Sequence, residues 1–370
     1  MQWLDDVEEY GCEEFLSTVY MCVTFAALIN VVDYSEPEIS KRAAAITDKM
    51  LSMLALHTYK TGIVAPMGRV YRSVLYPFDQ GAMALMNLIN PKLPYTFGEG
   101  WLGFYASSHY PIPEGLVKLM EDDVETNYTT GNARVYLEKN DDYCLTSVAS
   151  PREPFTRWEN ETLKEDVDIT THNFTKSFNE RFHGTTYFRP GTYGYQQHMW
   201  YAALDGEASI FVTHPGSTSE EGDMRPGYWH GNGVMPALKQ QHGLLGGIYV
   251  IPDEHPIGYT HLYCPECRFD EVINEENWIF LRKETGYLAL WCSEKLEAHN
   301  GMNFNCEQRA YSKNAAYLCV CGGQKSDVSF ATFKKRAKET SPSYDKESKT
   351  LTAQNFELSY VACKDVTQFL

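Results

Sequence analysis

Positive charge is scarce in this sequence. Its 370 residues hold 32 Lys and Arg against 49 Asp and Glu, a formal net charge of −17 at pH 7. Nucleic acids and anionic membranes are bound through concentrated basic faces, so neither is an expected partner. An acidic polysaccharide would feel the same repulsion. A site for one must therefore gather Arg and Lys locally.

Long hydrophobic runs are also missing. The longest apolar stretch, around "MCVTFAALINVV" at residues 21–32, is too short to cross a bilayer and predicts a buried helix. The beginning, "MQWLDDVEEY", has no basic region followed by an apolar core, so we expect no signal peptide in this chain. We therefore expect a cytoplasmic protein without a membrane partner, unless an upstream segment carries a signal.

Several chemical motifs are absent. The sequence has no phosphate-binding loop, no dinucleotide fingerprint and no nucleophile elbow. Its ten cysteines lack the spacing of a small disulfide-bonded domain and are expected to be reduced thiols. The run "HLYCPEC" offers His261, Cys264 and Cys267 to zinc, but a fourth ligand is not nearby. We therefore expect neither a metal nor another cofactor, with structural zinc at these three residues as the alternative.

Apolar residues make up 43% of the chain, enough for a large core, and the length suggests two domains. Residues 1–125 carry helical periodicity, with long helices predicted at 13–35 and 38–60 and shorter ones after them. Residues 126–370 instead hold short alternating runs between turn residues. The expected fold is therefore α+β and multidomain, with an antiparallel helical layer followed by a large antiparallel β-sandwich.

Polar and aromatic residues crowd three segments of the sandwich half. The segments are residues 178–190, 189–204 and 225–240, and the second and third begin with Arg-Pro-Gly. They hold a local surplus of cations together with groups that donate, accept or transfer protons. Their site candidates are His183, Tyr195, His198, Trp200, Arg225, Trp229, His230 and Asn232. The structural alternative is that Gly, Pro and Asn make tight turns while Tyr and Trp fill the sandwich.

The helical half offers a second polar segment, the loop at residues 57–80, which contains Arg69 and Tyr71. A tyrosine has a pKa of about 10, so its use as a base near neutrality requires adjacent positive charge. Arg69 and Arg72 could supply that charge. Alternatively, the tyrosines pack beneath the next helix and the arginines extend to solvent.

Two stretches resemble a known family. "GRVYRSVLYPFDQGAMALMNLI", residues 68–89, is similar to the tyrosine-bearing segment of the toroid in toroid-plus-sandwich polysaccharide lyases and heparinase II/III-like proteins. "NWIFLRKETGYLAL", residues 277–290, is similar to a strand pair of their sandwich. The resemblance implies that the helical layer is a partial α/α toroid. The chain departs from the family in having far fewer predicted helices.

The resemblance implies a carbon–oxygen lyase that acts on a uronic-acid-containing polysaccharide or oligosaccharide by β-elimination. Tyr71 corresponds best to the toroid tyrosine, with Arg69 as its electrostatic partner. His198 and His230 become candidates for the base or for neutralising the sugar carboxylate. Tyr195 and Asn232 would orient the substrate. We expect the loop with Arg69 and Tyr71 to close over the histidine-bearing strand ends.

Two other functions remain open. A glycoside hydrolase would need two carboxyl groups across the cleft, for which Glu13, Glu14, Asp79 and Glu99 are available. A capping or solvated role is the alternative for these acids. A non-catalytic carbohydrate-binding protein would use the aromatic residues to stack on sugars without proton transfer.

Overall fold

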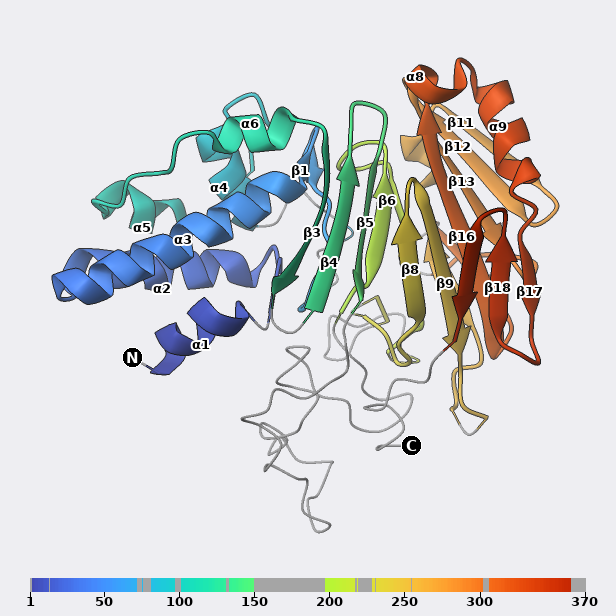
Figure 1. Ribbon diagram of the computed structural model, residues 1–370, viewed down its shortest axis with the longest axis horizontal. Helices are drawn as coiled ribbons and strands as arrows, with labels where there is room; N and C mark the ends of the chain where they lie inside the picture. Colours follow the sequence, from blue (N-terminus) through green and yellow to red (C-terminus); the bar gives the residue numbers. More distant parts are fainter. Residues whose placement is uncertain are drawn as a thin grey trace, which may run out of the picture.

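The computed structural model describes most of the chain. The described residues are 2–12, 14–71, 75, 81–96, 101–130, 133–149, 197–216, 218, 228–229, 231–253, 255–301 and 306–360. The helices before residue 122 occupy one end of the molecule, and two large sheets with two further helices make up the rest (Figure 1). The protein thus mixes helices with antiparallel sheets of eight and six strands, which is consistent with the expected sandwich.

The helical end is built around two long antiparallel helices. Apolar residues at helical spacing bury one face of each, including Phe25 and Ile29 of one and Met50 and Leu54 of the other. The second begins with Pro37, whose fixed φ suits a first helical turn. The helices here are α1 (Gln2–Tyr10), α2 (Tyr20–Tyr34), α3 (Pro37–His57), α4 (Gly81–Ile89), α5 (Trp101–Ser107) and α6 (Leu116–Glu121).

The change from helix to strand falls between α6 and β3 (Val124–Thr130), close to the expected boundary at residue 125. Tight contacts join the two parts there. The Lys139 ammonium lies 2.9, 3.2, 2.8 and 3.1 Å from the carbonyl oxygens of Leu56, Thr58, Leu119 and Met120, where α3 and α6 end. A cation is favourable at helix C-termini because the last carbonyls lack helical partners.

A short hairpin after α3 also touches the sheets. It consists of β1 (Thr58–Tyr59) and β2 (Gly62–Ile63). A Cβ on Gly62 would lie 2.7 Å from the Cα of Gly206, so glycine is required for this close backbone approach. The Gly206 amide also donates to Thr61 Oγ1 at 3.1 Å. The helical end is therefore fixed against the sheets at two places.

The larger sheet has eight antiparallel strands in the order β14-β15-β10-β7-β6-β5-β4-β3. Its strands after β3 are β4 (Ala133–Lys139), β5 (Cys144–Ala149), β6 (Trp200–Ala203), β7 (Ser209–Thr213), β10 (Thr260–Tyr263), β14 (Glu297–His299) and β15 (Glu307–Ala310). Burial alternates along β4, as expected for a strand with one face in the core.

The smaller sheet has six antiparallel strands in the order β11-β12-β13-β16-β9-β8. They are β8 (Ala237–Gln241), β9 (Leu244–Val250), β11 (Glu271–Glu275), β12 (Trp278–Lys283), β13 (Gly286–Cys292) and β16 (Asn314–Gly323). Every residue of β13 is buried, which indicates that both faces of the sheet are covered there.

Buried tyrosines join the two sheets. Tyr249 of β9 donates its hydroxyl to the carbonyl of Val212 in β7 at 2.7 Å. The hydroxyls of Tyr317 in β16 and Thr260 in β10 lie 2.5 Å apart. Both tyrosine side chains are almost completely buried. Part of the high tyrosine content therefore belongs to the core, where each hydroxyl needs a partner.

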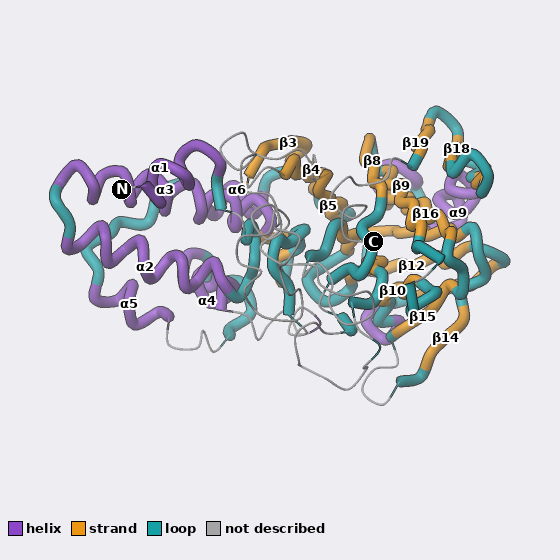
Figure 2. Tube along the Cα trace, turned by 90° about the horizontal axis from the view of Figure 1, so that it is seen from below, coloured by secondary structure: helices purple, strands orange, loops and turns teal. Residues whose placement is uncertain are grey.

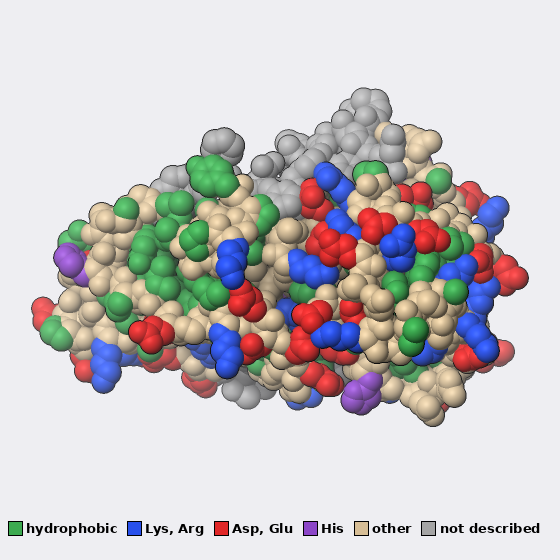
Figure 3. Space-filling view, turned by 90° about the horizontal axis from the view of Figure 1, so that it is seen from above, with side chains coloured by type: hydrophobic (Ala, Val, Ile, Leu, Met, Phe, Trp, Pro, Cys, Tyr) green, Lys and Arg blue, Asp and Glu red, His purple; other side chains and the backbone are tan. Residues whose placement is uncertain are grey.

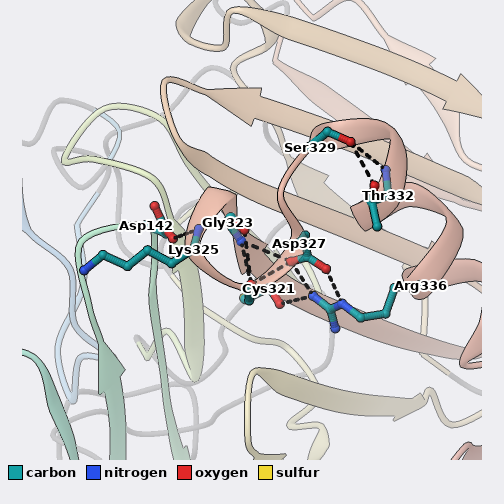
Figure 4. Close-up of polar contacts among 9 residues, drawn as sticks. Asp142, Cys321, Gly323, Lys325, Asp327, Ser329, Thr332 and Arg336 are labelled. Carbon is teal, nitrogen blue, oxygen red and sulfur yellow. Dashed lines mark hydrogen bonds and ion pairs between the residues drawn. The ribbon is translucent and has the colours of Figure 1, made fainter.

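A third layer covers the outer face of the smaller sheet (Figure 1). It contains α8 (Gln324–Asp327), α9 (Phe330–Glu339) and the sheet β17 (Ser343–Asp345), β18 (Thr350–Ala353) and β19 (Phe356–Ser359). The short helix η6 (Glu266–Arg268) instead lies beside β15 of the larger sheet, where Glu266 accepts from Gln308 Nε2 at 3.1 Å. Phe330 and Phe333 of α9 pack with Phe280, Leu351 and Phe356. A polar network around Asp327 links α8 and α9 to the end of β16 (Figure 4).

The structure corrects several expected elements. The helix predicted from residue 13 begins at Tyr20, because residues 14–19 form turns, and α1 was not predicted. Strands β17 and β18 lie in or next to a polar stretch in which no strand was expected. A small exposed sheet needs apolar residues on only one face, so its sequence can look polar. The late helix predicted at residues 328–339 is confirmed as α9.

The outer surface differs between the two ends. Over the sheets, charged side chains of both signs are interspersed, whereas hydrophobic side chains gather over the helices on the face drawn in Figure 3. Figure 2 shows α2, α4 and α5 side by side at the helical end. No helix within the described ranges is both long and apolar enough to cross a membrane.

Candidate functional site

One strand-like segment joins the helical end to the larger sheet, and it leads to Arg69 and Tyr71. Met67 and His198 form an antiparallel bridge, with Met67 N donating to His198 O at 2.9 Å and His198 N to Met67 O at 3.2 Å. On its other side, Gly68 N donates to Phe15 O at 2.9 Å. The loop and the start of the histidine-bearing strand therefore lie side by side. A substrate pocket shared by the two remains a prediction.

Three half-buried side chains meet just beyond this bridge. The hydroxyls of Tyr20 and Tyr71 lie 2.6 Å apart, and their rings are tilted at 40° with centroids 5.8 Å apart. The Arg69 guanidinium lies 5.7 Å from the Tyr20 ring and 5.8 Å from the Tyr71 ring. Arg69 Nε is also 3.6 Å from a carboxylate oxygen of Glu14. We call Tyr20, Tyr71 and Arg69 the tyrosine cluster.

The protonation state of the tyrosine cluster is not that of a catalytic base, which must be unprotonated to act. Burial raises the pKa of Tyr71, the hydrogen bond with Tyr20 raises it further, and Arg69 opposes both effects. Burial lowers the pKa of Arg69, but Glu14 and Tyr71 more than compensate and leave it raised. Near neutral pH the cluster thus holds a neutral phenol beside a guanidinium. That state suits a proton donor whose anion is stabilised as it forms.

His198 is placed beside the loop, but its ring is fully buried. Nε2 lies 2.9 Å from the carbonyl oxygen of Trp229, which only accepts, so Nε2 carries the hydrogen. Nδ1 lies 2.5 Å from the Tyr201 hydroxyl and accepts from it. Both ring nitrogens are therefore engaged, Nε2 with the backbone at Trp229 and Nδ1 with Tyr201 of β6. A direct role in proton transfer for His198 remains a prediction.

A second polar cluster lies behind Trp229 in the larger sheet. The Trp229 ring stacks on His261 at 4.2 Å, and His261 Nδ1 lies 3.4 Å from Glu307. Glu307 also accepts from Arg309 Nε at 2.7 Å and from the Tyr228 hydroxyl. Burial alone would raise the pKa of Glu307, but His261, Arg309 and Tyr228 lower it to about 2. We call these residues the Glu307 cluster.

Asn232 and Trp200 have structural contacts. Asn232 is buried, and its side chain accepts from His214 N at 3.1 Å and donates to Gln197 O at 2.8 Å. It therefore ties the loop after Trp229 to the segment before His198. Trp200 is 1% exposed and belongs to the core between the sheets. Trp229 is buried as well, so for all three a contact with substrate stays a prediction.

The other candidates lie outside the described residues. They are His183, Tyr195, Arg225 and His230, together with Glu13, Asp79 and Glu99 of the hydrolase alternative. Glu14 is the one acid of that alternative that the structure describes, and it pairs with Arg69. The carboxyl separation that distinguishes hydrolase mechanisms is thus not defined here.

The three residues considered as zinc ligands have other contacts or differ in exposure. His261 Nε2 lies 2.7 Å from Thr213 Oγ1, and its Nδ1 faces Glu307. Burial raises the pKa of the Cys264 thiol, whereas Cys267 is exposed. In the part of the chain that the structure describes, no three His, Cys, Asp or Glu side chains form a group that could hold a metal. The nine cysteines described there are free thiols.

A cavity of about 360 Å³ opens where the helices meet the sheets. Its lining includes Tyr59, Lys60, Asn90, Lys139 and Asp141. None of its lining residues was a site candidate, and none belongs to the tyrosine cluster. Its charges are of both signs, and Lys139 is already bound to backbone carbonyls. We therefore place the candidate site at the tyrosine cluster, where the proton-carrying groups meet.

Sequence reasoning missed Tyr20. It stands within an apolar helical pattern, where an aromatic residue is expected to pack in the core. The structure shows Tyr20 as the first residue of α2, but the sequence predicted a helix from residue 13 and so gave no signal for this position. The Glu307 cluster was missed because its members are separated by up to 81 residues and meet only when the sheet forms.

Comparison with protein-family models finds no match for this chain, and comparison with curated protein sequences finds none either.

Proposed function

We propose that this protein is a polysaccharide lyase that cleaves a uronic-acid-containing polysaccharide or oligosaccharide by β-elimination. The observation that carries the proposal is the bridge between Met67 and His198, which brings Arg69 and Tyr71 close to the start of β6, a central strand of the larger sheet. The resemblance of residues 68–89 to a toroid segment supports the same function. In this proposal the helices are part of an α/α toroid.

The proposed chemistry assigns one proton to Tyr71. A base removes the ring proton beside the sugar carboxylate, the electron pair forms a ring double bond, and the bond to the glycosidic oxygen breaks. Tyr71 gives its proton to that oxygen, because its raised pKa keeps it protonated near neutral pH. Arg69 stabilises the phenolate that remains.

The base and the group that neutralises the carboxylate are proposed from the sandwich half. His230 directly follows Trp229 in the chain, and Arg225 precedes it by a few residues. His198 holds the Trp229 backbone through its Nε2 hydrogen bond. We therefore assign His198 the role of positioning this loop and His230 the role of base or neutraliser.

The proposal is tested by incubating the purified chain with polygalacturonate, alginate, hyaluronan and heparin. Elimination creates ultraviolet absorbance from the new ring double bond, which we expect with at least one polymer. New reducing ends without that absorbance would indicate hydrolysis. Retention on a polymer without cleavage would indicate carbohydrate binding alone, and either result contradicts the proposal.

Tyr71→Phe sharpens the test. General acid catalysis contributes about 10²- to 10⁴-fold, so we expect a loss of that size in kcat. Tyr110→Phe is the matched control, because Tyr110 is a buried tyrosine that packs on Phe25 of α2 and donates to Asp48 at 2.5 Å. It should keep wild-type kcat even if its stability falls. Full activity in Tyr71→Phe would remove Tyr71 from the mechanism.

A further inference from the structure

The cavity of about 360 Å³ lies apart from the tyrosine cluster, where the helical end meets the sheets (Figure 1). Residues at the end of α6, in β1 and directly after β4 line it, among them Met120, Tyr59 and Asp141. Ligand pockets have volumes of about 300 to 1,000 Å³ and occur preferentially where two structural units meet. The cavity thus has the size and the position of a site for one small molecule.

The charged side chains that line this cavity balance one another. Three are ammonium groups and three are carboxylates, namely Lys60, Lys92 and Lys139, and Glu121, Asp122 and Asp141. This balance is local, because the whole chain has a net charge of −17. An anionic ligand would be repelled by the carboxylates and a cationic ligand by the lysines. The lining therefore favours a neutral ligand.

Two hydrogen-bond donors of the lining have no partner in the part of the chain that the structure describes. Asn90 is 6% exposed, and its Oδ1 accepts from Lys92 N at 3.2 Å, whereas its Nδ2 meets no acceptor there. The Lys60 ammonium lies 5.2 Å from the Tyr59 ring centroid and has no ion pair within the same ranges. A buried donor without an acceptor is costly, so a ligand oxygen at Asn90 Nδ2 would be stabilised.

The lining also offers acceptors and an apolar wall. Glu121 and Asp141 are more than half exposed, and each pairs with an exposed lysine. Exposed ion pairs contribute little stability, so these carboxylates can accept from a ligand at small cost. Leu93 and Met120 supply the apolar wall. Hydroxyl groups both donate and accept, and a sugar ring combines several of them with an apolar C–H face.

We propose that this cavity is a binding site for a neutral pyranose sugar. Asn90 Nδ2 and the Lys60 ammonium donate to its oxygens, the carboxylates accept from its hydroxyls, and the apolar wall contacts its C–H face. The site is separate from the tyrosine cluster, so its ligand does not depend on the lyase proposal. A bound sugar touches residues of both the helical end and the larger sheet and stabilises their junction.

Calorimetric titration with glucose, galactose, mannose and N-acetylglucosamine tests the site, with galacturonate as the charged comparison. A ligand of this size binds with a Kd of about 1 mM, and we expect such binding for at least one neutral sugar. The bound sugar should also raise Tm in proportion to its occupancy. Galacturonate should bind about 10-fold more weakly because of the three carboxylates. Absence of binding by all four neutral sugars, or tighter binding of galacturonate, overturns the inference.

Asn90→Asp tests whether the sugar occupies this cavity. The new side chain keeps the oxygen that accepts from Lys92 N and replaces the Nδ2 donor with a second oxygen. We expect sugar binding to weaken by about 10-fold or more, since a donor is lost and a fourth carboxylate enters the lining. Asn127→Asp, at an exposed residue of β3, is the matched control and should bind as the wild type does. Wild-type affinity in Asn90→Asp overturns the inference.

Lys60→Met provides a second variant that does not touch Asn90. It removes the other donor without a partner, so it should weaken sugar binding by about 10-fold as well, and wild-type affinity in this variant also counts against the site. Thermal unfolding of each variant without sugar checks the fold. A wild type that binds a neutral sugar but cleaves none of the four polymers would contradict the lyase proposal alone.

Discussion

The tyrosine cluster and the network around Asp327 both join a cation to oxygen acceptors, but their surroundings differ. Asp327 is buried, and Arg336 donates to both carboxylate oxygens, at 2.5 and 3.0 Å. Ser326 adds a bond at 2.7 Å, and Arg336 also donates to Cys321 O at 3.1 Å (Figure 4). The hydrogen bonds of this network thus join its members to one another.

In the tyrosine cluster, by contrast, the acceptors are two half-buried phenols that can each exchange a proton. Its members come from the helical end, beside the segment that pairs with the larger sheet. A buried ion pair whose hydrogen bonds are all satisfied contributes little net stability, but removing one partner is destabilising. The half-buried Tyr71 phenol instead holds a proton near neutral pH, because burial and Tyr20 raise its pKa, and the nearby Arg69 guanidinium opposes that rise. The first arrangement is expected to control stability and the second activity.

Arg69→Met should lower activity strongly, by an amount second to that of Tyr71→Phe. It removes the charge and the donor that stabilise the Tyr71 phenolate, so we expect kcat to fall by about 10²- to 10³-fold. Steady-state kinetics by product absorbance measures the loss. Arg134→Met is the control, because Arg134 is an exposed residue of β4. Similar kcat values for the two variants would contradict the role of Arg69.

Asp327→Ala should have the largest effect on stability and none on kcat. It removes the carboxylate that accepts from Gly323 N and from the partly exposed Arg336 guanidinium, and loss of hydrogen bonds to a buried charged group costs about 1.5 to 3 kcal/mol. Denaturant unfolding measures this loss. Asp345→Ala is the control, since Asp345 accepts only exposed bonds in a turn with Ser348. A reduced kcat at temperatures where Asp327→Ala is folded would erase the contrast between the two regions.

The Glu307 cluster tests an intermediate case, buried like the Asp327 network but adjacent to Trp229. The ordinary pKa of a glutamate is 4.5, and that of Glu307 is about 2 in the fold. Because the folded pKa is lowered, the stabilisation is fully present above pH 4.5 and is lost as the pH falls toward 2. The difference corresponds to about 3 kcal/mol.

Glu307→Gln should therefore flatten the decline in the free energy of unfolding between pH 4.5 and 2. Denaturant titrations across that range measure it. Glu125→Gln, at an exposed residue of β3, is the matched control and should leave the decline unchanged. An equally steep decline in Glu307→Gln would show that the Glu307 carboxylate does not carry the acid sensitivity.

Local patterns predicted much of the fold. Helix α3 was predicted because Pro37 and the spacing of its apolar residues act within one segment. Strands β12 and β13 were predicted for the same reason, whereas β17 and β18 were not. The order of strands within each sheet was not, since it depends on pairing between distant residues. For example, β16 pairs with β9 and β13 rather than with β15.

The candidate site was predictable only in part. Arg69, Tyr71 and His198 were recognised as residues whose chemistry suits proton transfer, and the loop and strand that bear them do lie side by side. Tyr20 was not recognised, because periodicity does not show which hydroxyl finds a tertiary partner. Asn232 was given a substrate role, whereas its amide binds two backbone groups that only the folded loop brings together.

Ser329→Ala should produce the smallest change in the free energy of unfolding among these variants. Ser329 caps α9, and its hydroxyl oxygen accepts from Thr332 N at 3.2 Å. Loss of this cap costs about 1 kcal/mol of unfolding free energy, because the amide then lacks its protein partner. Ser329→Asp keeps an acceptor and adds a negative charge near the helix N-terminus, so it should restore the stability. Neither variant should alter kcat, because α9 covers the far face of the smaller sheet. A kcat change in either one would mean that the outer layer, and not only the tyrosine cluster, determines activity.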